Sequence, residues 1–241
     1  MKSKILLAFV SLFFSAASLA SAGGHLDHAK VDVSDQQSLQ RGATMFVNYC
    51  MGCHSAGYMR YNQMSAGLGL SETEIMDTLM PANAKIAEHM NSAMPAADAT
   101  VWFGTAPPDL SLVARSRGVD WLYTYLRSFY KDDSRPFGVN NRVFADVGMP
   151  NVLWELQGIQ VPVYETVNGI QVIEKLALET PGTMSPEEYD AAVLDLVSFL
   201  SYIAEPIQLE RQALGIKVLI FLAIFLVIAY LLKKEYWKDI H

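Results

Sequence analysis

The feature of this 241-residue sequence that most constrains its fold is the pentapeptide Cys50-Met51-Gly52-Cys53-His54, which contains both cysteines of the chain. Two thiols separated by two residues, with a histidine directly after the second, suit the attachment of haem c. Each thiolate adds across one vinyl group of the porphyrin, and the imidazole of His54 then becomes the proximal iron ligand. The motif therefore predicts that the chain folds around a covalent haem.

Three other interpretations of the motif have less support. A thioredoxin-like dithiol would lie at a helix start after a strand, whereas the residues before Cys50 have helical spacing. A structural zinc site needs four ligands, and the sequence has neither a second cysteine pair nor an H-x-x-x-H to complete it. A chance match or a simple disulfide is the third, although cysteines this close rarely act as structural staples.

The N-terminus has the pattern of a secretory signal. Lys2 and Lys4 form a short basic region, residues 5–17 are apolar or small, and residues 20–22 (Ala-Ser-Ala) resemble a cleavage site. An uncleaved anchor helix is the alternative, but the apolar stretch is short. We expect a signal peptide at residues 1–22 and export to a bacterial periplasm, where haem c is attached.

The C-terminal apolar stretch predicts one transmembrane helix. Residues 214–232 contain a single charge, Lys217. At 1.5 Å rise per residue this stretch spans about 28 Å, close to the hydrocarbon thickness of a bilayer. Three lysines and two aromatic residues follow between 233 and 238, and the positive-inside rule places this side in the cytoplasm. We therefore expect a transmembrane helix at 213–233 and a cytoplasmic tail at 234–241.

The part between signal and anchor, residues 23–212, has the length of one domain and is strongly acidic. Residues 23–211 contain 12 Lys and Arg against 23 Asp and Glu, a net charge of −11 with histidine neutral. This charge argues against nucleic acid as a partner and favours soluble partners that present a basic face. A surface that is acidic for solubility alone is the alternative for any single carboxylate.

Helical signals recur through this exported part. Ser34, Ser71 and Ser185 each begin a capping-box pattern, with Glu or Gln three residues later and apolar residues at helical spacing. Gly42 in the first of these helices would allow a close approach to another helix. Residues 121–129 form a broad apolar stripe, which we expect to pack in a core that includes the haem.

The remaining segments predict a hairpin and loops. Asn168-Gly169 separates two β-branched runs, which predicts a β-hairpin over residues 161–174. Residues 55–69, rich in Gly, Ser and Asn, are expected to form a loop around the haem edge, and residues 94–104 an irregular segment. The fold class is therefore mainly α, with loop and small β-hairpin insertions and one C-terminal transmembrane helix.

The spacing leaves the distal iron ligand open. A methionine there raises the haem potential and closes the iron to other ligands, which suits electron transfer. Met149 stands out because Gly148 permits close approach to the porphyrin and Pro150 stiffens the segment. Met94-Pro95 and Met80-Pro81 share part of this pattern, so the residues alone do not decide among the three.

Several segments occur in a familiar order along the chain. After the signal-like N-terminus and the C-x-x-C-H motif come Pro107-Pro108-Asp109-Leu110-Ser111, Gly148-Met149-Pro150, Thr183-Met184-Ser185, Ala204-Glu205-Pro206 and the single apolar stretch. This order closely resembles the cytochrome c1 family, the haem subunits of the cytochrome bc1 complex (ubiquinol–cytochrome c reductase), in a bacterial form. The C-x-x-C-H motif is shared with all c-type cytochromes, whereas the P-P-D-L-S segment and the ordered set are specific to this family.

The resemblance implies a cytochrome c-like domain with one covalent haem c. Cys50 and Cys53 would form the thioethers, and His54 would be the proximal ligand. Met149, at the family's Gly-Met position, would be the distal ligand, which favours it over Met94.

Three further residues gain a role from the resemblance. Arg117 matches an arginine that pairs with a haem propionate, although a surface charge is the alternative for a single arginine. Pro107 and Pro108 would pack at the haem edge. The sequence departs from the mitochondrial pattern in having Pro-Asn after Met149, where Ala-Pro-Pro is common.

The resemblance also implies a function. The chain would take electrons from the Rieske iron–sulfur protein and pass them to a soluble or tethered c-type cytochrome, with no catalytic acid or base of its own. Quinol oxidation would belong to the assembled, dimeric complex with cytochrome b, in the bacterial inner membrane. A peroxidase-like tethered haem enzyme and a membrane-anchored monohaem carrier or oxidase subunit outside the bc1 complex are the alternatives.

Overall fold

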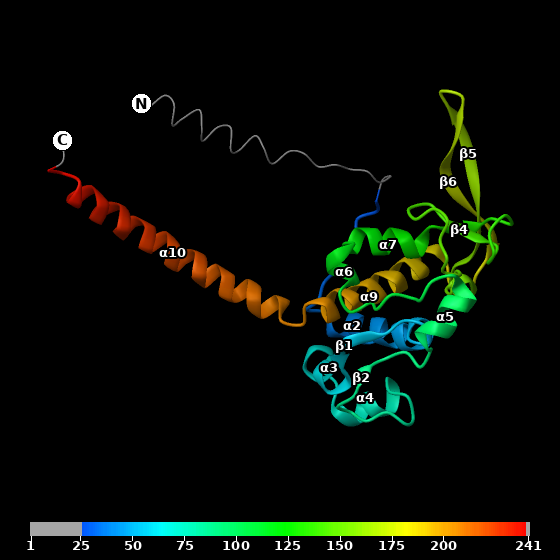
Figure 1. Cartoon of the computed structure of the whole chain (residues 1–241), viewed down its shortest axis with the longest axis horizontal. Coiled ribbons are helices and arrows are strands. Elements are labelled where there is room, and N and C mark those ends of the chain that lie inside the picture. The colour runs from blue at the N-terminus through cyan, green and yellow to red at the C-terminus, as the bar shows by residue number, and fades with distance from the viewer. Residues whose placement is uncertain (1–25, 240–241) are drawn as a thin grey trace.

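The structure is a computed structural model that describes residues 26–239. The predicted signal peptide, residues 1–22, lies outside the described residues, as does the end of the predicted tail at 240–241. Figure 1 shows a cluster of helices, a long β-ribbon at one margin and a single long helix that extends away from the cluster. Within the described residues the strands form three two-stranded antiparallel sheets.

The described residues contain mostly short helices and short strands. The helices are α2 (Gln36–Met45), its π-helical continuation η1 (Phe46–Cys50), α3 (Tyr61–Leu68), α4 (Glu72–Thr78), α5 (Ala96–Phe103), α6 (Val113–Ser116), α7 (Val119–Arg127), α8 (Trp154–Gln157), α9 (Pro186–Ala204) and α10 (Gln208–Tyr236). The strands, paired in the order given, are β1 (Ala56–Arg60) with β2 (His89–Met90), β3 (Phe129–Lys131) with β4 (Val139–Asn141), and β5 (Gly158–Val167) with β6 (Ile170–Pro181).

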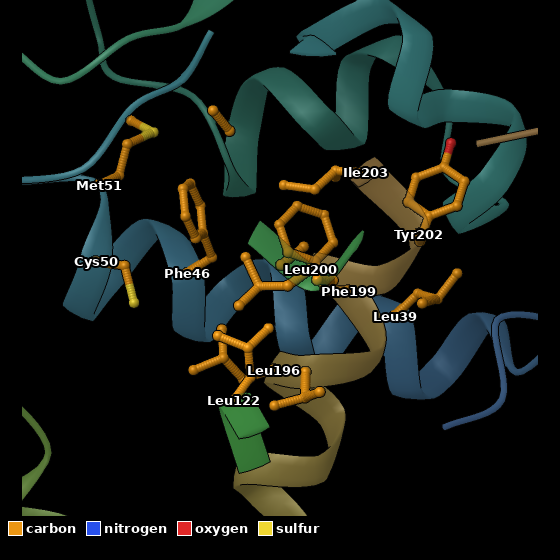
Figure 2. Packing of buried hydrophobic residues seen from close by; sticks show 14 of the residues in the cluster. Leu39, Phe46, Cys50, Met51, Leu122, Leu196, Phe199, Leu200, Tyr202 and Ile203 are labelled. Carbon is orange, nitrogen blue, oxygen red and sulfur yellow. The ribbon is translucent and has the colours of Figure 1, made fainter. Parts of the chain in front are cut away.

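The core is centred on the contact between α2 and α9. A Cβ atom at Gly42 would lie 2.1 Å from the backbone oxygen of Asp195, so the two helices approach too closely for any other residue. Beside this contact the rings of Phe46 and Phe199 are 5.7 Å apart and pack together (Figure 2). The expected close approach at Gly42 is therefore confirmed.

Helix α7 packs against α9 and is attached to it by polar contacts as well. Arg127, the last residue of α7, donates to the carboxylate of Asp190 at 2.5 and 2.7 Å and to that of Asp27 at 2.8 Å. The hydroxyl of Tyr189 donates to the backbone oxygen of Leu126 at 2.8 Å. A two-point arginine–carboxylate pair fixes orientation as well as distance, so α7 is held in place relative to α9.

Two of the three predicted capping boxes are confirmed, at Ser71 and Ser185. The third, predicted at Ser34, is wrong: the helix starts one residue later than predicted, and Asp35 caps it. The carboxylate of Asp35 accepts hydrogen bonds from two backbone N–H groups of the first turn of α2, at 3.0 and 3.1 Å. The hydroxyl of Ser34 donates instead to Asp32 at 2.6 Å. A carboxylate carries a full negative charge near the helix N-terminus, which favours Asp35 over a hydroxyl as the cap.

The predicted hairpin is confirmed as β5–β6 and is longer than the sequence indicated. Asn168 and Gly169 form its two-residue turn, with φ angles of 51° and 81°. Both angles lie in the left-handed region that asparagine and glycine tolerate, and such a turn matches the twist of the strands.

The expected loops at residues 55–69 and 94–104 are wrong. The first contains β1 and α3, and β1 finds its partner β2 some thirty residues later in the chain, with Ala56 opposite Met90. The second contains α5, which begins directly after Pro95. Pairing with a distant strand is a tertiary contact that local composition does not indicate, and tertiary contacts override weak local preferences.

Helix α10 extends from the domain into the surroundings (Figure 1) and none of its residues is buried. In the described part of the chain it is the one helix that is long and apolar enough to cross a membrane, with a mean hydropathy of 2.7 in its most apolar window. It begins at Gln208, before the predicted boundary at residue 213. The expected mainly α fold with hairpin insertions and a C-terminal apolar helix is confirmed.

Candidate functional site

A cavity of about 410 Å³ lies between α7, α9 and the segments that follow α5 and β4. Its wall contains all seven residues that were named from the sequence for haem attachment, ligation or packing: Cys50, Cys53, His54, Pro107, Pro108, Arg117 and Met149. None of residues 55–69, which were expected around the haem edge, lies on it. Most of the remaining wall is apolar, with contributions from Phe103, Leu110, Val113, Trp121, Leu122, Tyr125, Leu126, Phe144, Val147, Val152, Leu196 and Leu200. The fold therefore gathers residues from most of the chain around one apolar space.

The two cysteines reach the cavity from the end of the α2–η1 helix. The backbone N–H groups of Cys53 and His54 both donate to the backbone oxygen of Cys50, at 3.0 and 2.8 Å, which closes a tight turn. The side chains of Cys50 and Met51 point in opposite directions (Figure 2), so that Cys50 lines the cavity while Met51 packs in the core. Burial raises the pKa of the Cys50 thiol to about 12, because a thiolate is poorly solvated there.

The ring of His54 is oriented by a backbone carbonyl. Its Nδ1 lies 2.7 Å from the oxygen of Pro108, so the N–H of this nitrogen donates to the carbonyl. Burial lowers the pKa of His54, which favours the neutral ring, although the bond to Pro108 opposes this effect. A neutral ring with a proton on Nδ1 leaves the lone pair of Nε2 free to bind a metal ion.

The Pro107–Ser111 segment is bonded along its length to the residues after His54. Three hydrogen bonds join the two segments: Leu110 N to Ser55 O at 2.8 Å, Gly57 N to Asp109 Oδ2 at 2.8 Å, and Tyr58 N to Ser111 Oγ at 3.0 Å. Pro107 has no N–H to satisfy, which suits its position on an apolar wall. The P-P-D-L-S segment is thus held by contacts that fix the carbonyl of Pro108 beside His54.

Met149 reaches the cavity from an irregular segment that two asparagines hold. The side-chain oxygen of Asn141 accepts from the N–H groups of Val143 and Phe144, at 3.0 and 3.2 Å, and that of Asn140 accepts from Asp146 at 2.9 Å. Both asparagines are buried, so these bonds are shielded from water. Among the described residues, Met149 is the one methionine on the cavity wall.

The alternatives Met80 and Met94 lie away from the wall. Gly148 was expected to permit close approach to the porphyrin. A Cβ atom at Gly148 would meet its nearest neighbour, the oxygen of Phe103, at 3.5 Å, which is an ordinary contact. The protein itself therefore does not require a glycine at this position.

An aromatic cluster borders Met149, and most of it comes from the stripe at 121–129 that the sequence predicted to pack in a core that includes the haem. The ring of Tyr125 stacks on Trp121 at 4.8 Å and meets Phe129 and Phe144 edge-on at 5.1 and 6.4 Å. Its hydroxyl lies 3.4 Å from the sulfur of Met149. Burial raises the pKa of Tyr125 well above its usual range, so the phenol keeps its proton. The signal available from the sequence was the apolar stripe over 121–129, which does not single out Tyr125.

Arg117 places a cation at the cavity. Its guanidinium carbon lies 5.1 Å from the ring centre of Trp121 and 5.9 Å from that of Phe144. Arg117 is exposed, no ion-pair partner for it is found among residues 26–239, and its guanidinium lies against the two aromatic faces. An arginine in this state is ready to pair with an anionic group.

The residues on the wall fit haem c. Two thiols in one turn match the two vinyl groups, and a neutral imidazole nitrogen with a thioether sulfur is a ligand set that haem iron accepts. The cavity volume of about 410 Å³ lies within the usual range for a small-molecule site, about 300–1,000 Å³. An apolar wall with one free cation also suits a flat apolar ring that carries propionates.

Comparison with known proteins places the chain in a family. The model of the Cytochrome C1 family matches residues 28–98 and 79–240. A curated protein named cytochrome c1, from Allochromatium vinosum, is 50% identical over 99% of both chains.

Two further comparisons complete the picture. A Nitrosomonas europaea protein named ammonia monooxygenase gamma subunit is also 50% identical, over 90% of this chain and 89% of that protein. A chain of the solved structure "Hyperthermophilic respiratory Complex III" aligns with 99% of this chain and 98% of its own length. The two are 15% identical in sequence, and the TM-score is 0.45. The family model and the full-length relative agree, and the chain belongs to the cytochrome c1 family, whose members carry one covalent haem c.

Proposed function

We propose that the chain is the haem-carrying electron-transfer subunit of a cytochrome bc1 complex. In this role it takes electrons from a Rieske iron–sulfur protein and passes them to a c-type cytochrome during quinol oxidation. The observation that carries the proposal is the meeting of the C-x-x-C-H residues with Met149 on one apolar cavity, in a chain of this family. Bound haem c supplies a centre that accepts and releases one electron at a time.

The residues on the wall divide into attachment, ligation and packing. Cys50 and Cys53 would hold the haem as thioethers, and His54 and Met149 would be the iron ligands. Arg117, the free cation at the cavity, would pair with a propionate. Pro107 and Pro108 would pack against the porphyrin, on the part of the wall that they form.

The chain's own residues keep the iron closed to other chemistry. The carbonyl of Pro108 fixes the tautomer of His54 and directs Nε2 away from the backbone. The loop held by Asn140 and Asn141 presents the sulfur of Met149. With His54 and Met149 both bound, the haem iron would have no open position for peroxide, and electron transfer would need no proton donor or acceptor from the chain.

The apolar helix α10 and the acidic charge of the exported domain support the proposed location and partners. Residues 1–22 would be removed as a signal peptide, residues 23–212 would be periplasmic, and α10 would anchor the chain, with residues 234–241 in the cytoplasm. Beside α10 we place cytochrome b, in a dimeric complex of the inner membrane. The negative charge of the exported domain would attract a basic c-type cytochrome by long-range steering.

Affinity purification through a C-terminal tag tests this assignment. Solubilised membranes should yield the tagged chain with cytochrome b and the Rieske protein in equal amounts. Recovery of the chain alone, or with an oxidase or a monooxygenase, would contradict the bc1 assignment. Recovery with a monooxygenase would agree with the name of the Nitrosomonas europaea relative.

A reduced spectrum separates electron transfer from peroxidase-like chemistry. We expect a low-spin haem whose spectrum does not change when carbon monoxide is added, because His54 and Met149 would both bind the iron. Binding of carbon monoxide to the native protein would indicate an open or labile sixth position, and would favour the tethered haem enzyme.

A further inference from the structure

The hydroxyl of Tyr125 is placed to act on the sulfur of Met149. The two atoms are 3.4 Å apart, within the range of a hydrogen bond to sulfur. The ring cannot turn away easily, because Trp121 stacks on it and Phe129 meets its edge. Asn141 donates to the backbone oxygen of Tyr125 at 2.8 Å and also holds the loop that leads to Met149. The two side chains are therefore positioned by one shared framework.

Packing alone does not explain the hydroxyl of Tyr125. The side chain is 9% exposed, so its O–H is largely removed from water. A thioether sulfur is a weak acceptor and returns little of the cost of burying a phenol. Phenylalanine would fill the same space in the aromatic cluster without this cost. The hydroxyl is better explained by its effect on the sulfur.

We propose that Tyr125 is a positioning residue that tunes Met149 as an iron ligand, an inference that rests on the proposed ligation of haem iron by Met149. A thioether sulfur has two lone pairs, so one can accept the phenol proton while the other binds iron. The hydrogen bond withdraws electron density from the sulfur and makes it a weaker donor. When the donor is weakened, oxidised iron loses more stabilisation than reduced iron does. The hydrogen bond therefore raises the reduction potential.

Tyr125→Phe in the full-length holoprotein tests this tuning. Tyr61→Phe is a matched control, because the Tyr61 hydroxyl lies 3.5 Å from the sulfur of Met51, a methionine that is not on the cavity wall. Redox titration should show a lower potential for Tyr125→Phe and no change for Tyr61→Phe. We expect the ratio of reduced to oxidised haem at a fixed ambient potential to fall about two- to tenfold, where tenfold corresponds to 59 mV.

The pH stability of the oxidised protein distinguishes an effect of Tyr125 on the Met149 sulfur from a purely structural role in holding the loop. Without the hydrogen bond, the sulfur of Met149 is a stronger donor to oxidised iron. The red absorption band of the sulfur–iron bond should therefore persist to higher pH in Tyr125→Phe than in the native protein. A purely structural role for Tyr125 would loosen the loop, and the band would then disappear at lower pH, which would overturn the proposal.

Met149→Leu distinguishes failure of this inference from failure of the proposed ligation. If Met149→Leu lowers the potential while Tyr125→Phe leaves it unchanged, the tuning role of Tyr125 is wrong and the ligand assignment stands. If neither substitution moves the potential, Met149 is not the ligand, and the proposed function loses its distal residue. A lower potential in both, with the Tyr61→Phe protein unchanged, supports both proposals.

Discussion

The residues that would ligate the iron are held in different ways. His54 follows a hydrogen-bonded turn at the end of a helix, and the carbonyl of Pro108 fixes its ring. Met149 lies in a segment without regular structure, whose path depends on the side chains of Asn140 and Asn141. The proximal side is thus built from backbone and the distal side from side-chain contacts. Substitutions on the distal side should therefore change the reduction potential of the haem while leaving the fold largely intact.

Met149→Leu should lower the reduction potential by on the order of 0.1 V, a fraction of the roughly 0.8 V that axial ligands span. Leucine has a similar volume, so the loop should keep its packing, but it offers no sulfur to the iron. Redox titration of the purified holoprotein measures the change, and quinol-to-cytochrome turnover should stop with it. Met94→Leu is the matched control, since Met94 also precedes a proline but lies off the cavity wall. An unmoved potential in Met149→Leu would show that another residue binds the iron.

The sequence could predict those residues whose chemical role follows from a fixed spacing within a short motif. The thiols of Cys50 and Cys53 and the imidazole of His54 form a local motif. Tyr125 and Asn141 could not be found this way, because their roles depend on contacts with residues that lie well away in the chain. A tyrosine in an apolar stripe and an asparagine before a loop are both common, and only the fold shows what each of them touches.

At the scale of elements, the α2–α9 contact determines where the haem motif lies. Helix α2 continues through η1 to Cys50, so the position of α2 against α9 sets the position of the thiols. Leu196 and Leu200 of α9 also line the cavity. A shift of α2 along α9 would therefore move the attachment residues relative to the wall that receives the porphyrin.

Gly42→Ala should destabilise the protein by about 1–3 kcal/mol, the usual cost of overpacking, even though alanine is the better helix former. The added Cβ would lie 2.1 Å from the backbone oxygen of Asp195, and a backbone atom cannot rotate away as a flexible side chain would. Urea unfolding followed by circular dichroism measures the loss. Thr44→Ala, an exposed change in the same helix, should cost far less. Equal stability of the Gly42→Ala and native proteins would contradict the close packing of α2 on α9.

Elements with a complete capping or turn signal were predicted, whereas the short strands and the helices α3 and α5, which lack such a signal, were not. The capping boxes at Ser71 and Ser185 and the Asn168-Gly169 turn are complete within a few residues. Strand β1 needs β2, and β3 needs β4 across a polar segment, so neither strand has a pattern of its own. The cap at Asp35 instead of Ser34 shows that even a local signal fixes a helix start only to within a residue.

At the scale of the whole molecule, residues 26–239 form a compact domain and one helix that contributes nothing to the domain's core. None of the residues of α10 is buried, and the helix leads away from the domain (Figure 1). A side-chain link between the two is the pair of Arg211 with Glu205, where the arginine holds the pKa of Glu205 below its usual value. The C-terminal apolar stretch of the sequence predicted this division into a domain and an apolar helix.

A chain that stops after Ile207 should fold, bind haem and leave the membrane. The domain loses no buried side chain with α10, because α10 has none. Fractionation of cells that express the shortened chain should place the haem-containing protein in the soluble periplasmic fraction, whereas the full chain stays with the membranes. A shortened chain that remains membrane-bound would show that α10 is not the anchor.

The attachment of haem to the two thiols is tested most directly by the mass of one peptide. Trypsin cleaves after Arg41 and Arg60, so both cysteines fall on the single peptide 42–60. In the mature protein from cells that can attach haem, this peptide should carry the mass of one haem, and neither Cys50 nor Cys53 should react with an alkylating reagent. A peptide of unmodified mass in which both thiols are alkylated would contradict the account.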